Sequence, residues 1–122
     1  MSNQYKLLII DDNEEILTSL YKFFRQKNYL VVSATSGLDG LKILESEKKE
    51  FDIIITDLVM PNISGVAVIS IAKKKFPDIP IIAITGWGEH PEALAIEANA
   101  DFVLEKPFDL DELDNLVTSI LS

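Results

Sequence analysis

Acidic residues follow two apolar segments of this 122-residue chain, at positions where their carboxylates can act together. Asp57 follows the largely apolar stretch 51–56, and Asp11 with Asp12 follows the stretch 7–10. Segments this rich in β-branched residues are typical of strands buried on both faces of a parallel sheet, and open α/β sheets bind ligands at the carboxyl ends of their strands. Three carboxylates gathered at such an edge need a cation to balance their charge. The sequence therefore predicts a cation site.

Two further polar residues stand at the ends of other predicted strands. Thr85 ends the apolar segment 81–84, and Lys106 with Pro107 follows the segment 102–105. Taken alone, a strand-end aspartate is more often a turn residue or a helix cap, and a threonine is more often an ordinary strand former. An acidic triad, a hydroxyl and a lysine that all stand at strand ends are hard to produce by chance. We therefore expect them to converge on one edge of a sheet.

The elements that would position these residues alternate between strand and helix. We expect strands at Lys6–Ile10, Leu30–Ala34, 51–56, Ile81–Thr85 and Phe102–Glu105. We expect five helices. The first begins at about Asn13, the second follows a Ser36 cap, and the third runs from 63–65 to about Lys75. The fourth runs from about Pro91 to Asn99, which closes it in a left-handed conformation, and the fifth covers 111–121 after a capping pair formed by Asp109 and Glu112. Five such units with short connections predict an α/β fold, a flavodoxin-like (βα)5 doubly wound parallel sheet in strand order 2-1-3-4-5.

Composition narrows the class of protein. The chain is expected to form one domain over residues 1–122, and its 48% hydrophobic and 25% charged residues are ordinary for a globular protein. It has no apolar run long enough to span a bilayer, no secretory signal at the N-terminus and no cysteine. We therefore expect a cytoplasmic protein with no membrane partner and no thiolate metal site.

The net charge of −9 is concentrated in the last third of the chain. Residues 1–75 carry ten basic and ten acidic side chains, whereas residues 76–122 carry ten acids and a single base, Lys106. Direct binding to nucleic acid is therefore not expected. The acidic excess either serves solubility or forms a docking face for a basic protein partner, and the sequence leaves both interpretations open.

The combined motif resembles the receiver domain of two-component response regulators, in particular the single-domain, chemotaxis-regulator-like members. The matching residues are Asp11-Asp12, Asp57-Leu58-Val59-Met60-Pro61 with Gly65, Thr85, and Lys106-Pro107-Phe108. The resemblance extends over essentially the whole chain, and this set at this spacing is highly specific. It implies a phosphorylation-dependent signalling switch and not a conventional enzyme, although the domain would catalyse its own phosphotransfer and dephosphorylation.

The resemblance also implies how the acidic residues act. Asp57 would accept a phosphoryl group from a phosphohistidine on a sensor histidine kinase or a histidine phosphotransfer protein. Mg²⁺ would be held by Asp12, Asp57 and the backbone carbonyl of Val59, with Asp11 acting through water. These roles agree with the chemistry, because phosphoryl transfer depends mainly on positioning and on stabilisation of charge.

The remaining motif residues would bind and report the phosphoryl group. Lys106, aimed inward by a cis peptide bond to Pro107, would pair with phosphoryl oxygens, and Thr85 would reach the same group. The implied output surface comprises the fourth helix, the fifth strand and the fifth helix, and this surface contains the acidic excess. A downstream protein target with a basic patch is therefore expected to bind there.

Two positions affect how the switch is expected to work. Receivers usually carry Tyr or Phe three residues before the active-site lysine, where its change of rotamer is coupled to the threonine, but this chain has Val103 there. We therefore expect little contribution from an aromatic rotamer change. We expect signalling to run mainly through the loop 86–88 and the fourth helix. Trp87 and Val59 occupy positions that, in the family, border the path of the water that attacks the phosphoryl group. Because both side chains are apolar and Trp87 is bulky, we expect slow hydrolysis of the phosphoryl-aspartate. Packing of Trp87 on the fourth helix, away from the site, is an equally open interpretation.

Two other functions fit parts of the pattern less well. A haloacid-dehalogenase-type phosphatase also uses an aspartate nucleophile with Mg²⁺, but it needs a second acid two residues later, where this chain has Val59. A flavodoxin-like cofactor binder needs a phosphate loop after the first strand, where the acidic stretch 11–15 would repel a phosphate. The sequence leaves open whether the chain is a stand-alone regulator, a phosphorelay shuttle or part of a larger protein.

Overall fold

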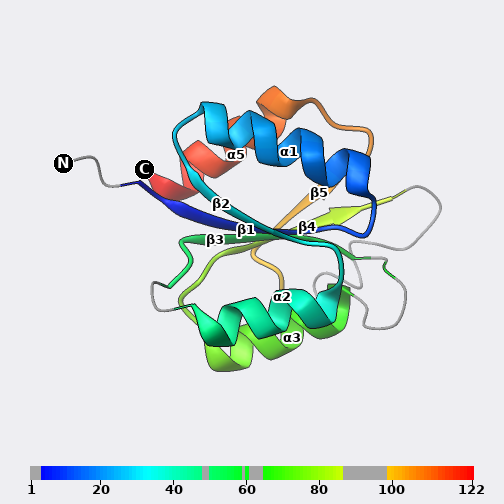
Figure 1. The fold of residues 1–122 in the computed structure, drawn as a ribbon, viewed down its shortest axis with the longest axis vertical. Coiled ribbons are helices and arrows are strands. Elements are labelled where there is room, and N and C mark those ends of the chain that lie inside the picture. The colour runs from blue at the N-terminus through cyan, green and yellow to red at the C-terminus, as the bar shows by residue number, and fades with distance from the viewer. Residues whose placement is uncertain (1–3, 48–49, 59, 61–64, 87–98) are drawn as a thin grey trace.

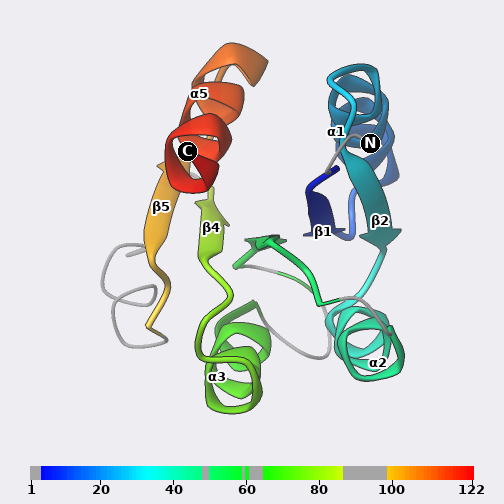
Figure 2. The same cartoon turned by 90° about the vertical axis from the view of Figure 1, so that its left-hand side faces the viewer.

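The structure, a computed structural model, describes residues 4–47, 50–58, 60, 65–86 and 99–122, and in these a parallel sheet lies between two layers of helices (Figure 1). The strands are β1 (Lys6–Ile10), β2 (Leu30–Ala34), β3 (Ile53–Asp57), β4 (Ile81–Thr85) and β5 (Phe102–Glu105), in the order β2-β1-β3-β4-β5. The helices are α1 (Glu14–Gln26), α2 (Gly37–Ser46), α3 (Gly65–Lys75) and α5 (Leu110–Leu121). Helices α1 and α5 cover one face of the sheet, and α2 and α3 cover the other (Figure 2). The predicted α/β fold and strand order are confirmed.

Some predicted boundaries differ from the observed ones. Strand β3 spans Ile53–Asp57 instead of residues 51–56. It begins later because the Asp52 carboxylate accepts a hydrogen bond from the Lys6 backbone N at 2.8 Å, ahead of the regular ladder. Helix α5 begins one residue earlier than expected, at Leu110. The predicted fourth helix lies outside the described residues, but Asn99 after it has the expected left-handed conformation, with φ at 69°. Among the helices that are described, none is long and apolar enough to cross a bilayer.

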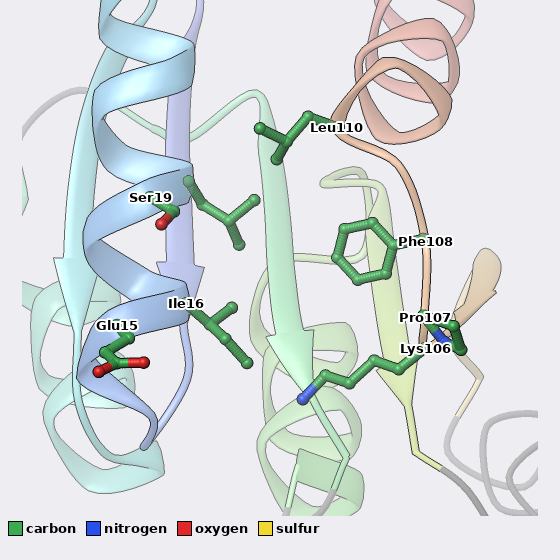
Figure 3. Close-up of a pocket in the computed structure, with 8 residues that line it drawn as sticks. Glu15, Ile16, Ser19, Lys106, Pro107, Phe108 and Leu110 are labelled. Atoms are coloured by element: carbon green, nitrogen blue, oxygen red, sulfur yellow. The ribbon is translucent and has the colours of Figure 1, made fainter.

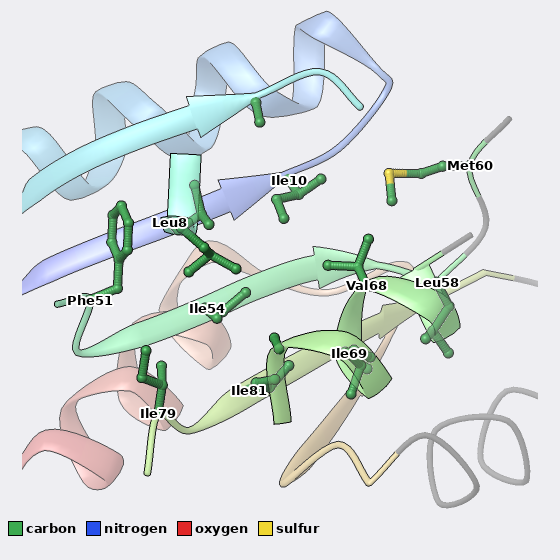
Figure 4. Packing of buried hydrophobic residues seen from close by; sticks show 14 residues of the cluster. Leu8, Ile10, Phe51, Ile54, Leu58, Met60, Val68, Ile69, Ile79 and Ile81 are labelled. Atoms are coloured by element: carbon green, nitrogen blue, oxygen red, sulfur yellow. The ribbon is translucent and has the colours of Figure 1, made fainter. Parts of the chain in front are cut away.

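The three central strands are buried along their whole length, and alternate residues face the two helix layers. Leu8, Ile10 and Ile54 pack against α2 and α3 (Figure 4), whereas Ile9 and Ile55 pack beneath α1 and α5. Full burial of one such side chain stabilises the fold by about 1.5–3 kcal/mol. The carboxyl ends of these strands therefore form a rigid platform.

Side-chain caps hold the loops that leave this platform. The Asn13 side chain accepts hydrogen bonds from the backbone N of Glu15 and of Ile16, at 3.0 and 3.1 Å, and so starts α1 directly after the acidic pair. Ser36 caps α2 in the same way, accepting from the Asp39 backbone N at 3.1 Å. A cap of this kind contributes about 1 kcal/mol. The first helix is thereby fixed close to the residues expected to do chemistry.

Candidate functional site

Three carboxylates gather at the carboxyl edge of the sheet. Strands β1 and β3 are neighbours, with Ile10 opposite Thr56, so the residues that end them lie side by side. Asp11, Asp12 and Asp57 each offer one oxygen, and these oxygens lie within 4.8 Å of one another. Asp11 and Asp57 are buried, whereas Asp12 is exposed. The cluster therefore combines an enclosed pair of carboxylates with a third that solvent can reach.

The side chain of a lysine that follows β5 reaches the same cluster. The Lys106 Nζ lies 3.2 Å from the Asp57 Oδ2 and 3.9 Å from the Asp11 Oδ2. Its backbone N donates to the Thr85 carbonyl at 2.8 Å, and the peptide bond to Pro107 is cis. Figure 3 shows the side chain extending from the segment after β5 toward the end of β3. A compact cation on a flexible side chain thus stands beside Asp57, where added negative charge would need a partner.

Asp11 is the carboxylate of the cluster whose charged form is disfavoured by its surroundings. Its Oδ1 accepts a hydrogen bond from the Asn13 backbone N at 2.9 Å, but its Oδ2 is buried and has no hydrogen-bond partner in the described part of the chain. Burial, more than any other influence, raises the pKa of Asp11, and the Asp57 and Asp12 charges raise it further, against the opposing effects of the Asn13 N–H and Lys106. A hard divalent cation would remove both problems, because it prefers carboxylate oxygens as ligands. The residues present therefore fit Mg²⁺.

A buried hydroxyl completes the described site. The Thr85 Oγ1, at the end of β4, is buried, and among the residues that the structure describes it has no hydrogen-bond partner. Such a group costs free energy unless a ligand or water satisfies it. Thr85 lies opposite Glu105 on β5, and Glu105 is the residue directly before Lys106. The hydroxyl and the lysine are therefore presented by adjacent strands at one edge.

The other predicted site residues are less fully described. Val103, on β5, is partly buried and packs against the core on the α2 and α3 side, whereas Phe102 is 39% exposed. Val59 and Trp87 lie outside the described residues. The expected role of the Val59 carbonyl as a metal ligand therefore stays a prediction, as does the expected position of Val59 and Trp87 beside the attacking water.

Gly65 has a role at this site that the sequence did not reveal. It begins α3, and its backbone N donates to the Leu58 carbonyl at 3.0 Å. A Cβ added at Gly65 would lie 1.9 Å from the Asp57 carbonyl oxygen, far inside any real contact. Sequence reasoning noted this glycine only as a member of the motif. Its spacing from Asp57 was the available signal, but the close approach appears only when α3 is packed on the sheet.

Comparison with known proteins decides the family. The family model described as the response regulator receiver domain matches residues 7–118. The chain belongs to this family. The resemblance of the motif to receiver domains is thereby confirmed.

Curated relatives contain the receiver as one part of a larger protein. The response regulator SaeR of Staphylococcus epidermidis is 36% identical over 108 residues, which are 88% of this chain and 46% of that protein. The sensor kinase CckA of Brucella abortus is 31% identical over 122 residues, 99% of this chain and 13% of that protein. The chain therefore spans less than half the length of these relatives.

Solved structures show the same fold. A receiver domain protein from Clostridium thermocellum has a TM-score of 0.88 and 30% identity, with 96% of this chain and 94% of that one covered. The response regulator TrrA of Thermotoga maritima, solved in complex with Mg²⁺–BeF, has a TM-score of 0.85 and 31% identity, with 96% and 99% covered. This chain is thus a receiver domain with an acidic pocket that fits a phosphorylation site.

Proposed function

We propose that this receiver accepts a phosphoryl group on Asp57 from a phosphohistidine and acts as a phosphorylation-dependent switch of protein binding. The observation that carries the proposal is the position of Lys106, whose Nζ lies 3.2 Å from the Asp57 Oδ2 within a cluster of three carboxylates. An aspartate in this setting is both a nucleophile and one member of a cation site. An ordinary buried ion pair would not need Asp11 and Asp12 beside it.

Mg²⁺ is the proposed cofactor. Asp11, Asp12 and Asp57 would hold it, together with the carbonyl of Val59, which lies outside the described residues. When bound, the ion supplies the positive charge that offsets repulsion between the Asp57 carboxylate and an incoming anionic phosphoryl group. The donor set fits this role because it consists of oxygens alone, and one of them, the Asp11 Oδ2, is buried with no hydrogen-bond partner within the described ranges.

The protein's own groups carry the transfer. A carboxylate oxygen of Asp57 forms a bond to phosphorus as the bond from phosphorus to the donor imidazole breaks. Lys106 leaves its ion pair with Asp57 to pair with the phosphoryl oxygens. The Thr85 hydroxyl, which is buried without a partner among the described residues, donates to the same group, so phosphorylation would give it a hydrogen bond there. This new bond couples the chemistry to the end of β4.

The proposed partners are a sensor histidine kinase or a histidine phosphotransfer protein upstream and a protein target downstream, in the cytoplasm. A groove of about 470 Å³ lies between α1 and the segment before α5 and reaches Lys106 (Figure 3). Ile16, Phe108 and Leu110 line it, so an apolar side chain of a phosphodonor can be seated close to Asp57. The proposed output surface comprises β5, α5 and the predicted fourth helix, which lies outside the described residues, and exposed acids such as Asp111 on α5 favour a basic target.

Phosphoryl uptake by the purified chain tests this function. With Mg²⁺ and acetyl phosphate as the donor, the wild type should gain the mass of one phosphoryl group, and the Asp57→Asn variant should gain none. Chelation of Mg²⁺ should abolish the gain in the wild type. The proposal fails if Asp57→Asn is labelled as well as the wild type, or if uptake is independent of divalent cations.

A further inference from the structure

Thr56 is the one hydroxyl residue of β3, whose other members before Asp57 are three isoleucines. Its side chain is completely buried. The Thr56 Oγ1 donates a hydrogen bond to the backbone carbonyl of Asp57 at 3.1 Å. A buried hydroxyl is costly unless it is bonded, so this bond is what makes a polar residue tolerable in the strand.

Packing alone does not account for a hydroxyl at this position. Thr56 lies opposite Ile10 on β1 and Ala83 on β4, and both belong to the apolar cluster between the sheet and helices α2 and α3. Valine has nearly the same shape, favours strands equally and has no polar group to satisfy. The feature that separates threonine from valine here is the bond to the Asp57 carbonyl.

That carbonyl belongs to the peptide group between Asp57 and Leu58, which is held at several points. The Leu58 N–H of the same peptide donates to the Ile84 carbonyl at 2.9 Å. Gly65 approaches the Asp57 carbonyl so closely that no side chain fits between them. The Asp57 carboxylate precedes this peptide and lies 3.2 Å from the Lys106 Nζ. The orientation of the peptide therefore sets where the carboxylate stands relative to the chain that follows it.

We propose that Thr56 is a positioning residue of the receiver site, whose buried hydroxyl locks the Asp57–Leu58 peptide in the orientation required for cation binding and phosphoryl uptake. Thr56 acts through the backbone, since its side chain lies on the α2 and α3 side of the sheet. The inference rests on the proposed function and names a residue that the acidic and basic motif does not contain. It also explains why an isoleucine-rich strand includes one hydroxyl directly before the nucleophile.

Two substitutions separate the hydroxyl from the shape of the side chain. Thr56→Val keeps the shape and removes the donor, whereas Thr56→Ser keeps the donor and removes a methyl group. For each purified chain, Mg²⁺ affinity is measured by calorimetry, the rate of phosphoryl uptake from acetyl phosphate is measured at saturating Mg²⁺, and stability is measured by urea unfolding. An ordinary hydrogen bond corresponds to a factor of about 2–12 in an equilibrium or rate, which sets the scale of the expected effect.

Thr56→Val should lower the uptake rate about fivefold and weaken Mg²⁺ binding about threefold. Its unfolding midpoint should stay close to that of the wild type, because the added apolar burial offsets the lost hydrogen bond. Thr56→Ser should stay within about twofold of the wild type in uptake and Mg²⁺ binding, although it loses stability. Wild-type values for Thr56→Val, or equal impairment of both variants, would overturn the inference. If the wild type binds Mg²⁺ but takes up no phosphoryl group, the proposed function fails while the Mg²⁺ affinities still decide the role of Thr56. A wild type that does neither overturns both.

Discussion

Replacing Gly65 with alanine should damage both the fold and the phosphoryl site. The added Cβ would start 1.9 Å from the Asp57 carbonyl oxygen and 2.6 Å from the Leu58 Cα, and ordinary contact begins at 3.4 Å. The start of α3 and the end of β3 must therefore separate by about 1.5 Å. Both are backbone, so no flexible side chain can absorb the displacement.

The magnitude follows from two opposing effects. Overpacking of this kind costs about 1–3 kcal/mol, and alanine returns at most about 1 kcal/mol of helix propensity at the first position of α3. We expect a net loss of about 1–2 kcal/mol in the free energy of unfolding. Because the moved carbonyl belongs to Asp57, and a misplacement of about 1 Å can cost 100-fold in rate, phosphoryl uptake should fall by about that factor.

Urea unfolding followed by circular dichroism gives the stability, and uptake from acetyl phosphate gives the rate. Gly86→Ala is the matched control, because a Cβ at Gly86 meets no atom of the described residues within 4 Å. That variant should match the wild type in unfolding or exceed it by less than about 1 kcal/mol, through the reduced entropy of the unfolded chain. If Gly65→Ala unfolds at the wild-type midpoint and is phosphorylated at the wild-type rate, the close approach does not constrain the site.

Three further outcomes are expected. The pKa of Asp11 is raised on folding, so its contribution to stability is present below the ordinary value of 3.8 and is lost as the pH rises through the folded-state value. Asp11→Asn should therefore stabilise the Mg²⁺-free protein at neutral pH, and urea titrations should show the advantage shrinking as the pH falls; an advantage independent of pH would contradict this origin. Mg²⁺ should raise the melting temperature of the wild type, and Asp12→Asn should reduce that increase, whereas an unchanged increase would remove Asp12 from the cation site. Charge reversal of the exposed Asp111 and Glu112 in α5 should weaken binding of the downstream target by about tenfold at low salt and less at high salt, and binding data that show no salt dependence would reject a basic partner.

The sequence by itself determined the architecture and the chemical content of the site. Apolar runs rich in isoleucine marked the central strands, since only strands buried on both faces can lack polar alternation. Short connections between strand and helix then implied a parallel sheet, and in such a sheet all carboxyl ends share one edge. The convergence of Asp11, Asp12, Asp57, Thr85 and Lys106 on that edge could therefore be expected before any coordinates were known. The sequence alone predicts the start of β3 two residues too early, because the hydrogen bond between the Asp52 side chain and β1 leaves no trace in hydropathy.

Only the tertiary structure decided the distances, the burial and the backbone contacts. Lys106 follows β5 and Asp57 ends β3, and β4 lies between these two strands, so the 3.2 Å between their charged atoms depends on how the sheet twists and packs. The raised pKa of Asp11 depends on burial, which is a property of the packed molecule and not of the Asp-Asp pair. Gly65 and Thr56 acquire their roles in the same way, because each acts on the Asp57 carbonyl through a contact that exists only once α3 and the sheet are assembled. Residue types thus specify which chemistry is possible, and packing specifies the geometry in which it can occur.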